Sequence, residues 1–152
     1  MSTNRKAYTF DLDLILHDGV ALTASAAGNV TTAIGDVGAG ARIIDLGAGL
    51  VEGDIIVDVS SLDVDTNNEM VTIGVQISDD SDFSSTYWQV SSLQVGDEAV
   101  VAGDQAMTTG RYVIPFNNMI ADGVNKRYLR LYFTIVGTLS FDCFAYLVKR
   151  SR

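Results

Sequence analysis

The sequence predicts an all-β fold: a single-domain, antiparallel, jelly-roll-like β-sandwich of about eight strands. Apolar residues alternate with polar ones over stretches of strand length, and no stretch has the periodicity of an amphipathic helix. The chain contains 14 glycines but one proline, so Gly, Asn and Asp must make most of the turns between the apolar runs. Many short strands separated in this way favour an antiparallel sandwich over a parallel α/β sheet.

The clearest alternation predicts a strand over residues 70–78. Val71, Ile73, Val75 and Ile77 would face the core, and Thr72, Gly74, Gln76 and Ser78 would face solvent. The other expected strands are residues 8–16, 41–46, 52–62, 87–95, 110–115, 127–136 and 139–148, and residues 20–24 either continue the first strand or start another. The short Gly137-Thr138 connection is typical of a hairpin, so the last two strands are expected to pair.

The 152 residues suffice for one domain with its own core. We expect an N-terminal arm with the start of the first strand at residues 1–13, the sandwich at residues 14–148, and a basic tail at residues 149–152. The apolar run near the start is short and is interrupted by Asp11 and Asp13, which argues against a signal peptide or a membrane span. The expectation is a soluble protein made in a cytoplasm.

The sequence is poor in the residues that catalysis requires. His17 is the sole histidine, which excludes His-rich metal sites, and beside Asp18-Gly19 it is interpreted as a turn residue. Cys143, the sole cysteine, falls on the same side of its strand as Phe141 and Ala145 and is interpreted as a buried, inert thiol. No Gly-x-Ser-x-Gly motif is present. We therefore expect no enzymatic activity, no cofactor and no metal.

Two acidic clusters were candidates for calcium loops and are better explained as polar loops. Oxygen-bearing side chains alternate as at the start of a calcium loop, at Asp63, Asp65, Asn67 and Glu69. The rest of the pattern is absent, because Asn68 stands where a calcium loop has its glycine and Gly74 stands where it has its bidentate glutamate. Residues 78–82, Ser-Asp-Asp-Ser-Asp, can simply cap a strand. The glycines of residues 35–40 lack the Lys-Ser/Thr ending of a phosphate-binding loop and indicate a flexible connection.

The net charge of −9 is unevenly distributed along the chain. Residues 43–110 contain no Lys or Arg, and most of the acidic residues lie there, whereas the basic residues gather at residues 5–6, 126–130 and 149–152. Nucleic acid is not an expected direct partner, because phosphate contacts need a continuous basic patch. Two interpretations remain: acids that keep an exposed β surface soluble, or a bipolar molecule whose basic ends dock on a partner in a salt-sensitive way.

The expected strand at residues 127–136 has an unusual polar face. Its apolar residues would be core, which leaves Tyr128, Arg130 and Tyr132 together on the opposite side. Tyrosine and arginine are frequent anchors at protein interfaces, so this face is either a contact surface or an exposed sheet face with cross-strand Tyr–Arg stacking. The candidate contact residues, with those of the basic ends, are Arg5, Lys6, Tyr8, Arg127, Tyr128, Arg130, Tyr132, Lys149 and Arg150.

Four segments, in order, carry a resemblance to a known family. They read LILHDGVALTASAAG (14–28), ARIIDLGAG (41–49), VTIGVQISDDSDFSS (71–85) and RYLRLYFTIVG (127–137), and IIDLG, VQISDDSDF and RYLRLYFTIVG are the most specific parts. Over residues 14–148 the chain resembles the capsid cement, or decoration, proteins of short-tailed bacteriophages. It departs from that pattern in a longer N-terminal segment, residues 1–13, and a longer 97–125 region.

The resemblance implies a virion structural protein with a jelly-roll-like β-sandwich. Such a protein is made in the host bacterial cytoplasm, binds the outer surface of the phage head and bridges major capsid protein subunits, without catalytic residues and without a membrane. It would act as a homo-oligomer, with a homodimer expected first because isologous pairs are the commonest assembly, and a homotrimer as the alternative.

An alternative function is a carbohydrate- or receptor-binding β-sandwich of a viral fibre. Its candidate site is Tyr87-Trp88, which follows the acidic residues Asp79, Asp80 and Asp82. Alternation along a strand would place one of the two aromatic side chains in the core, which weakens this interpretation.

Overall fold

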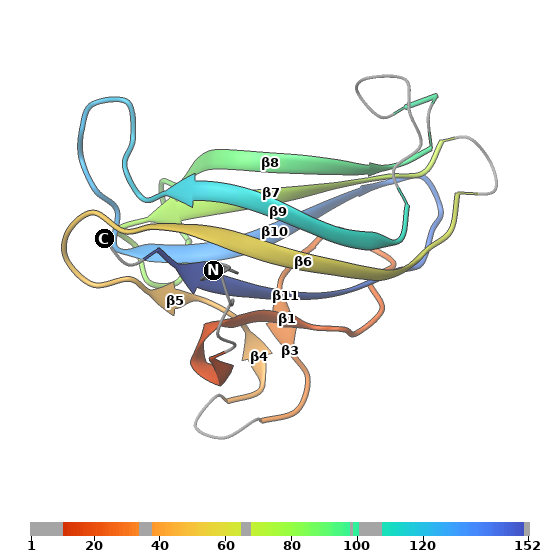
Figure 1. Ribbon diagram of the computed structural model, residues 1–152, viewed down its shortest axis with the longest axis horizontal. Coiled ribbons are helices and arrows are strands. Elements are labelled where there is room, and N and C mark those ends of the chain that lie inside the picture. The colour runs from red at the N-terminus through yellow and green to blue at the C-terminus, as the bar shows by residue number, and fades with distance from the viewer. Residues whose placement is uncertain (1–10, 34–37, 65–67, 98, 101–107, 151–152) are drawn as a thin grey trace, which may run out of the picture.

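The computed structural model describes residues 11–33, 38–64, 68–97, 99–100 and 108–150. In this part of the chain the fold is all-β, as predicted, with two sheets packed face to face as a sandwich and a small third sheet (Figure 1). Every strand pairing is antiparallel. A 3₁₀ turn, η1 (Leu12–Leu14), precedes the first strand. No helix among the described residues is long and apolar enough to cross a membrane.

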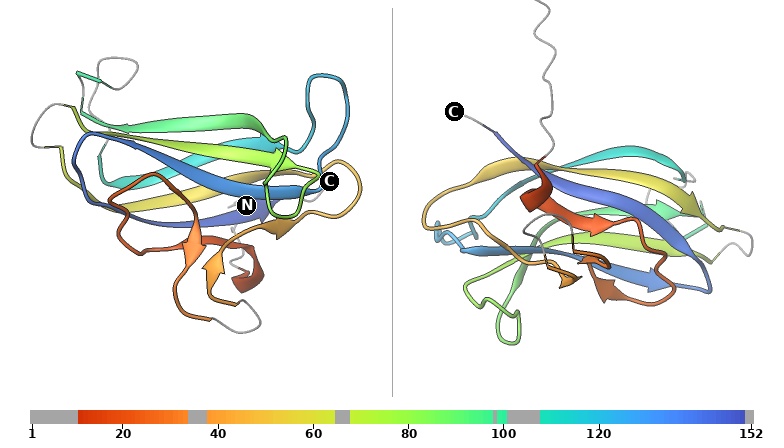
Figure 2. Two further views of the ribbon diagram at one scale, coloured as in Figure 1. Left: turned by 180° about the vertical axis from the view of Figure 1, so that it is seen from behind. Right: turned by 90° about the horizontal axis from the view of Figure 1, so that it is seen from below.

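The two main sheets form the two layers seen in the right-hand view of Figure 2. The first sheet has the order β1 (Ile15–Asp18), β11 (Phe141–Lys149), β6 (Glu52–Leu62), β9 (Gly110–Asn117). The second has the order β2 (Ala26–Ala27), β10 (Tyr128–Val136), β7 (Met70–Ser78), β8 (Trp88–Gly96), and β5 (Ile44–Asp45) also pairs with β10. The third sheet pairs β3 (Asn29–Val30) with β4 (Gly40–Ala41).

The core lies between the two layers and is built by alternate residues of the long strands. The inward residues with 0% exposure include Val71, Ile73, Val75 and Ile77 of β7, Leu129, Leu131 and Phe133 of β10, and Ile55, Val57, Phe141 and Leu147 of the facing sheet. The prediction for the apolar face of residues 70–78 is therefore confirmed.

The opposite face of β7 is less exposed than predicted. Gly74, Gln76 and Ser78 are buried although they point away from the core. A Cβ atom at Gly74 would lie 2.3 Å from the side-chain oxygen of Gln89, and the Ser78 hydroxyl donates to the Thr86 carbonyl at 2.8 Å. A neighbouring side chain and a loop thus cover this part of the outer face, and strand alternation alone contains no information about such a cover.

Most strand boundaries agree with the alternation. Residues 52–62 and 70–78 form strands as predicted, and the strands expected at 87–95, 110–115, 127–136 and 139–148 differ from the observed bounds by two residues or fewer at each end. The beginning of the chain differs more. The described part of the first predicted strand is η1 followed by β1, residues 20–24 contribute a single bridge at Leu22, and residues 41–46 are divided between β4 and β5.

The hairpin predicted at Gly137-Thr138 is wrong. β10 pairs with β7 in one sheet, whereas β11 pairs with β6 in the other, so the connection crosses between the layers. Gly137 has a φ of +83°, and a Cβ atom there would lie 2.8 Å from the Asn68 backbone carbonyl. Two small residues indicate that the chain reverses, but which layer receives the next strand depends on packing.

The interpretation of His17 as a turn residue is also wrong, because His17 belongs to β1 and is 0% exposed. Its Nε2 lies 2.9 Å from the Val20 carbonyl oxygen, and its Nδ1 accepts the Asn29 backbone N–H at 3.2 Å. A carbonyl can only accept, so the ring is neutral with its proton on Nε2. The centre of its ring lies 5.1 Å from the centre of the Phe133 ring. Burial lowers the pKa of His17 below the usual 6.5.

Because the folded pKa of His17 is lowered, the unfolded chain binds its proton more readily. We therefore expect the free energy of unfolding to be unaffected by this residue above its unfolded pKa of about 6.5 and to fall as pH drops below that value. Urea unfolding between about pH 7 and pH 5 measures this, and His17→Gln should show a shallower decline. A His17 imidazole that titrates by NMR at or above the unfolded value would contradict the expectation.

Candidate interaction surface

The outer side of β10 carries the three residues that the sequence singled out. Leu129 and Leu131 are fully buried, whereas Tyr128, Arg130 and Tyr132 are half-exposed on the opposite side of the strand. The predicted division of this strand into an apolar and a Tyr–Arg side is therefore confirmed. We call Tyr128, Arg130 and Tyr132, together with Gln76, Phe83 and Tyr87, the β10 face.

Arg130 is at the centre of the β10 face. Its Nε donates to Oε1 of Gln76 at 2.8 Å, directly across the strand pair. Its guanidinium carbon lies 4.4 Å from the centre of the Phe83 ring, 5.3 Å from that of Tyr87 and 5.4 Å from that of Tyr132. This partial burial lowers the pKa of Arg130 from its usual value. The planar guanidinium of Arg130 thus packs among three aromatic rings of the same chain.

The loop between β7 and β8, residues 79–87, brings two of these rings to Arg130. The left-hand view of Figure 2 shows it folded back across one end of the second sheet. Phe83 is 5% exposed and has a φ of +56°, a conformation that non-glycine residues seldom adopt. The sequence pattern does not predict that Phe83 is buried, because its burial depends on Arg130, about fifty positions further along the chain.

The acidic cluster of this loop is used internally. Asp80 accepts hydrogen bonds from the Ser84 hydroxyl and the Ser85 backbone N–H, both at 2.9 Å, and these bonds hold the pKa of Asp80 well below its usual range. The cluster acts as a capped polar loop, as its sequence indicated. Among the described residues no group of three or more His, Cys, Asp or Glu side chains is placed to hold a metal ion, and Asp65 and Asn67 lie outside those residues.

Two basic residues just before β10 contact neighbouring segments through ion pairs and a cation–π contact. Lys126 Nζ lies 2.7 Å from Asp79 Oδ2 and 4.5 Å from the centre of the Trp88 ring. Arg127 makes a two-point contact with Asp45 at 2.8 and 2.7 Å. Chiefly through this contact the pKa of the Asp45 carboxyl falls to about 2.

The charges that are separated along the sequence are brought together in the fold. The four ion pairs among the described residues each join an acid of residues 43–110 to a base outside that range: Asp58–Arg111, Asp79–Lys126, Asp45–Arg127 and Asp54–Arg150. Most of these side chains are well exposed, so each pair adds little stability. Their effect is to place both signs side by side, which reduces the bipolar character expected from the sequence.

The predicted contact residues occupy two separate places. Arg127, Tyr128, Arg130 and Tyr132 lie together at β10, whereas Lys149 ends β11 in the other sheet. Arg150 follows it and donates from Nε to Asp54 Oδ2 at 3.1 Å, so this part of the predicted tail is held against β6. Arg5, Lys6 and Tyr8 lie outside the described residues.

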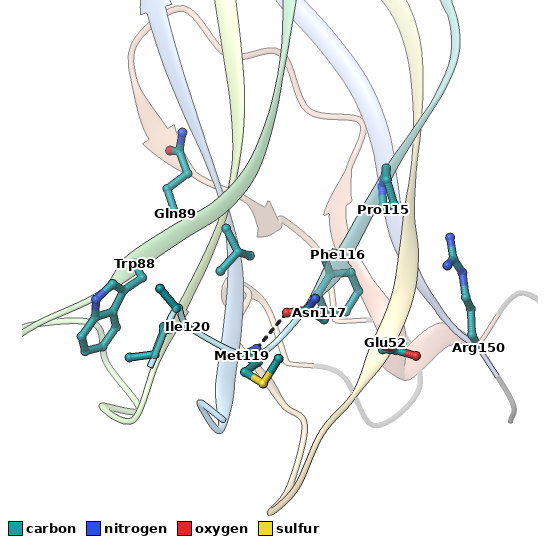
Figure 3. Close-up of a pocket in the computed structure, with 11 residues that line it drawn as sticks. Glu52, Trp88, Gln89, Pro115, Phe116, Asn117, Met119, Ile120 and Arg150 are labelled. Atoms are coloured by element: carbon teal, nitrogen blue, oxygen red, sulfur yellow. Dashed lines mark hydrogen bonds between the residues drawn. The ribbon is translucent and has the colours of Figure 1, made fainter. Parts of the chain in front are cut away.

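A hollow of about 520 Å³ lies between the start of β8 and the end of β9. Figure 3 shows Trp88 and Ile120 on one side of it and Phe116, Asn117 and Arg150 on the other. Its floor is supported by Asn118, a fully buried amide that bridges the chain near Gly49, Val51 and Lys126. Strand alternation contains no signal for this hollow, because it forms where the edges of two sheets meet.

The aromatic pair Tyr87-Trp88 and the side chains of His17 and Cys143 lie in different surroundings. Tyr87 is 48% exposed and turned toward Arg130, while Trp88 is half-buried against the core, so the two do not form one aromatic platform for a sugar. Cys143 is fully buried, as predicted, and burial raises the pKa of its thiol. His17 and Cys143, the two side chains weighed as catalytic groups, are thus both enclosed in the core.

We expect Arg130→Ala to lower the free energy of unfolding by about 2 kcal/mol, because it removes a charged hydrogen bond and the cation that the rings pack on. Hydrogen exchange in residues 79–87 should accelerate as their contact with the sheet is lost. Thermal unfolding and exchange mass spectrometry measure both effects.

Arg127→Ala is the matched control for this substitution. It removes an arginine just before the same strand, but its ion pair with Asp45 is exposed and should contribute little to the free energy of unfolding. Equal losses from the two substitutions would show that Arg130 has no special role in holding the loop.

Comparison of the chain with models of known protein families and with functionally described proteins finds no match.

Proposed function

We propose that this protein is a capsid cement, or decoration, protein that binds the outer surface of a phage head and bridges neighbouring major capsid protein subunits. The observation that carries the proposal is that the three most specific segments of the resemblance lie side by side in the fold. Residues 43–47 contain β5, residues 75–83 contain the end of β7 and its loop, and residues 127–137 contain β10. β10 pairs with both of the others, so segments far apart in sequence form one continuous surface.

Side-chain contacts join these segments as well as the strand pairing does. Arg127 binds Asp45, and Arg130 packs on Phe83, so each segment contributes a residue held by another. Surfaces that bind other proteins are enriched in large aromatic and arginine side chains, and adhesion to a shell needs no reactive group. The β10 face has these properties.

The strand order supports the jelly-roll part of the proposal. Of the long strands, only β7 and β8 are consecutive partners in one sheet, and the chain passes from one layer to the other between β6 and β7 and at each connection from β8 to β11. A four-stranded sheet that faces a five-stranded sheet, with the long strands connected in this alternating way, is consistent with a double Greek-key roll. Such a sandwich keeps its outer faces rigid while long loops vary at its ends.

The proposed mechanism is stabilisation by mass action. A protein that binds the assembled shell, and not the separated subunits, shifts the equilibrium toward the shell. Repetition of the site over a symmetric lattice, and simultaneous contact with two subunits, raises a modest affinity per site. A homodimer on a two-fold axis fits this bridging role, and a homotrimer on a three-fold axis is the alternative.

We expect the purified protein to pellet with empty, expanded shells of the virus that encodes it and to saturate at a fixed ratio to the shell protein. Co-sedimentation with quantification of both chains measures that ratio, which also distinguishes two-fold from three-fold sites. If the folded protein stays in the supernatant at all concentrations, the proposed function is wrong.

The Tyr128→Ala, Tyr132→Ala double variant tests whether the β10 face makes the contact. It removes two large half-exposed rings but leaves Arg130 to hold the loop, so we expect shell binding to weaken by tenfold or more, in line with the roughly 1–2 kcal/mol that an interface anchor contributes. The control is Val113→Ala, an exposed apolar residue on β9 of the other sheet. Unchanged binding by the double variant would assign the contact to another surface.

A further inference from the structure

The edges of the two sheets differ in how they are protected from pairing with another chain. An edge strand presents backbone N–H and C=O groups that can template a further strand, and proteins usually block them with charge, proline, bulges or a covering segment. At β1, the Arg42 guanidinium donates to the Ile15 carbonyl at 2.9 Å. At β9, Pro115 lacks an N–H and Arg111 carries a charge. β2 and β5 are two residues long.

β8 is the exception among the described edge strands. It is nine residues long, WQVSSLQVG, and contains neither proline nor a charged residue. β7 pairs with one edge of β8, and the described chain pairs no strand with its other edge; β8 is the uppermost strand in Figure 1. Val90 forms a bulge near its start, after which residues 91–96 pair regularly with β7. A long neutral edge in a chain of net charge −9 is a site for strand addition.

The chemistry of β8 favours a second copy of the same chain as the added strand. In a two-fold pairing the same strand of both copies forms the interface, so charged residues on that strand would meet like charges from the partner and repel them. Amide and hydroxyl side chains avoid this repulsion because they both donate and accept hydrogen bonds. The exposed side chains of β8 are Gln89 and Ser92, which are self-complementary in this sense. The half-buried Val90 and Leu93 add apolar area along the same edge.

We propose that β8 is the homodimer interface: two copies pair antiparallel through β8 and join their second sheets into one continuous sheet. Closure by a two-fold axis uses up both edges, so the assembly stops at two chains. It also sets two β10 faces on the same side of the joined sheet, which suits contact with two neighbouring subunits. This last consequence rests on the proposed function, whereas the dimer itself does not.

Sedimentation equilibrium of the isolated protein, without shells, tests the proposal. We expect the wild type to have twice the 16.3 kDa mass of the chain. Ser92 is exposed and lies opposite Gly74 on the outer face, so a lysine there is tolerated by one copy but adds a cation from each copy to the joined edge of the dimer. Ser92→Lys should therefore halve the mass. Thr134→Lys, an exposed residue of the same outer face on β10, adds the same charge away from the edge and should remain dimeric.

Several outcomes would overturn the β8 interface. They are a monomeric wild type at high concentration, a dimeric Ser92→Lys, or loss of the dimer in both lysine variants. Hydrogen exchange of the wild type provides a second measurement that needs no substitution, because dilution should accelerate exchange at alternate amides of β8. Exchange that is independent of concentration counts against the proposal. Since shell binding is measured separately by co-sedimentation, failure of the dimer and failure of the cement function are distinguishable.

Discussion

Burial of one side of β10 is the constraint on which the rest of the structure depends. Leu129, Leu131 and Phe133 are fully enclosed between the layers, and β10 is the one strand that pairs with β2, β5 and β7. A shift of its register by one residue would move the whole apolar set to solvent and the arginine into the core. The same constraint therefore fixes the sheet order and places Tyr128, Arg130 and Tyr132 on the outer side.

The outer side of β10 is organised by its own chain before any partner binds. Arg130 is surrounded by rings from two segments, and the residues before β10 hold Asp45 and Asp79. The guanidinium of Arg130 stacks on these rings within the chain, while Tyr128 and Tyr132 remain half-exposed. Under the proposed function this arrangement is an advantage, because a surface already held by its own contacts loses less conformational entropy on binding.

The electrostatics of the molecule follow from the same folding topology. The acidic partners of the four ion pairs between described residues lie at residues 45–79 and the basic partners at residues 111–150, so each pair joins these two parts of the chain. This leaves a chain that is strongly acidic overall but locally mixed in charge at β10 and at the end of β11. The nine residues of β8 carry no charge of their own, although the Lys126 ammonium lies over Trp88 at the start of this strand.

The alternation of apolar residues by itself determined the all-β class, the position of the long strands and the two sides of β7 and β10, because burial of one side of a strand acts on each residue directly. Tertiary structure decided what alternation does not encode. The Gly137-Thr138 turn became a crossover because its strands belong to different layers, and His17 became a core residue because Val20, Asn29 and Phe133 meet its ring. The cover over Arg130 and the hollow beside Trp88 arise between segments distant along the chain, whose proximity exists only after the two sheets have packed.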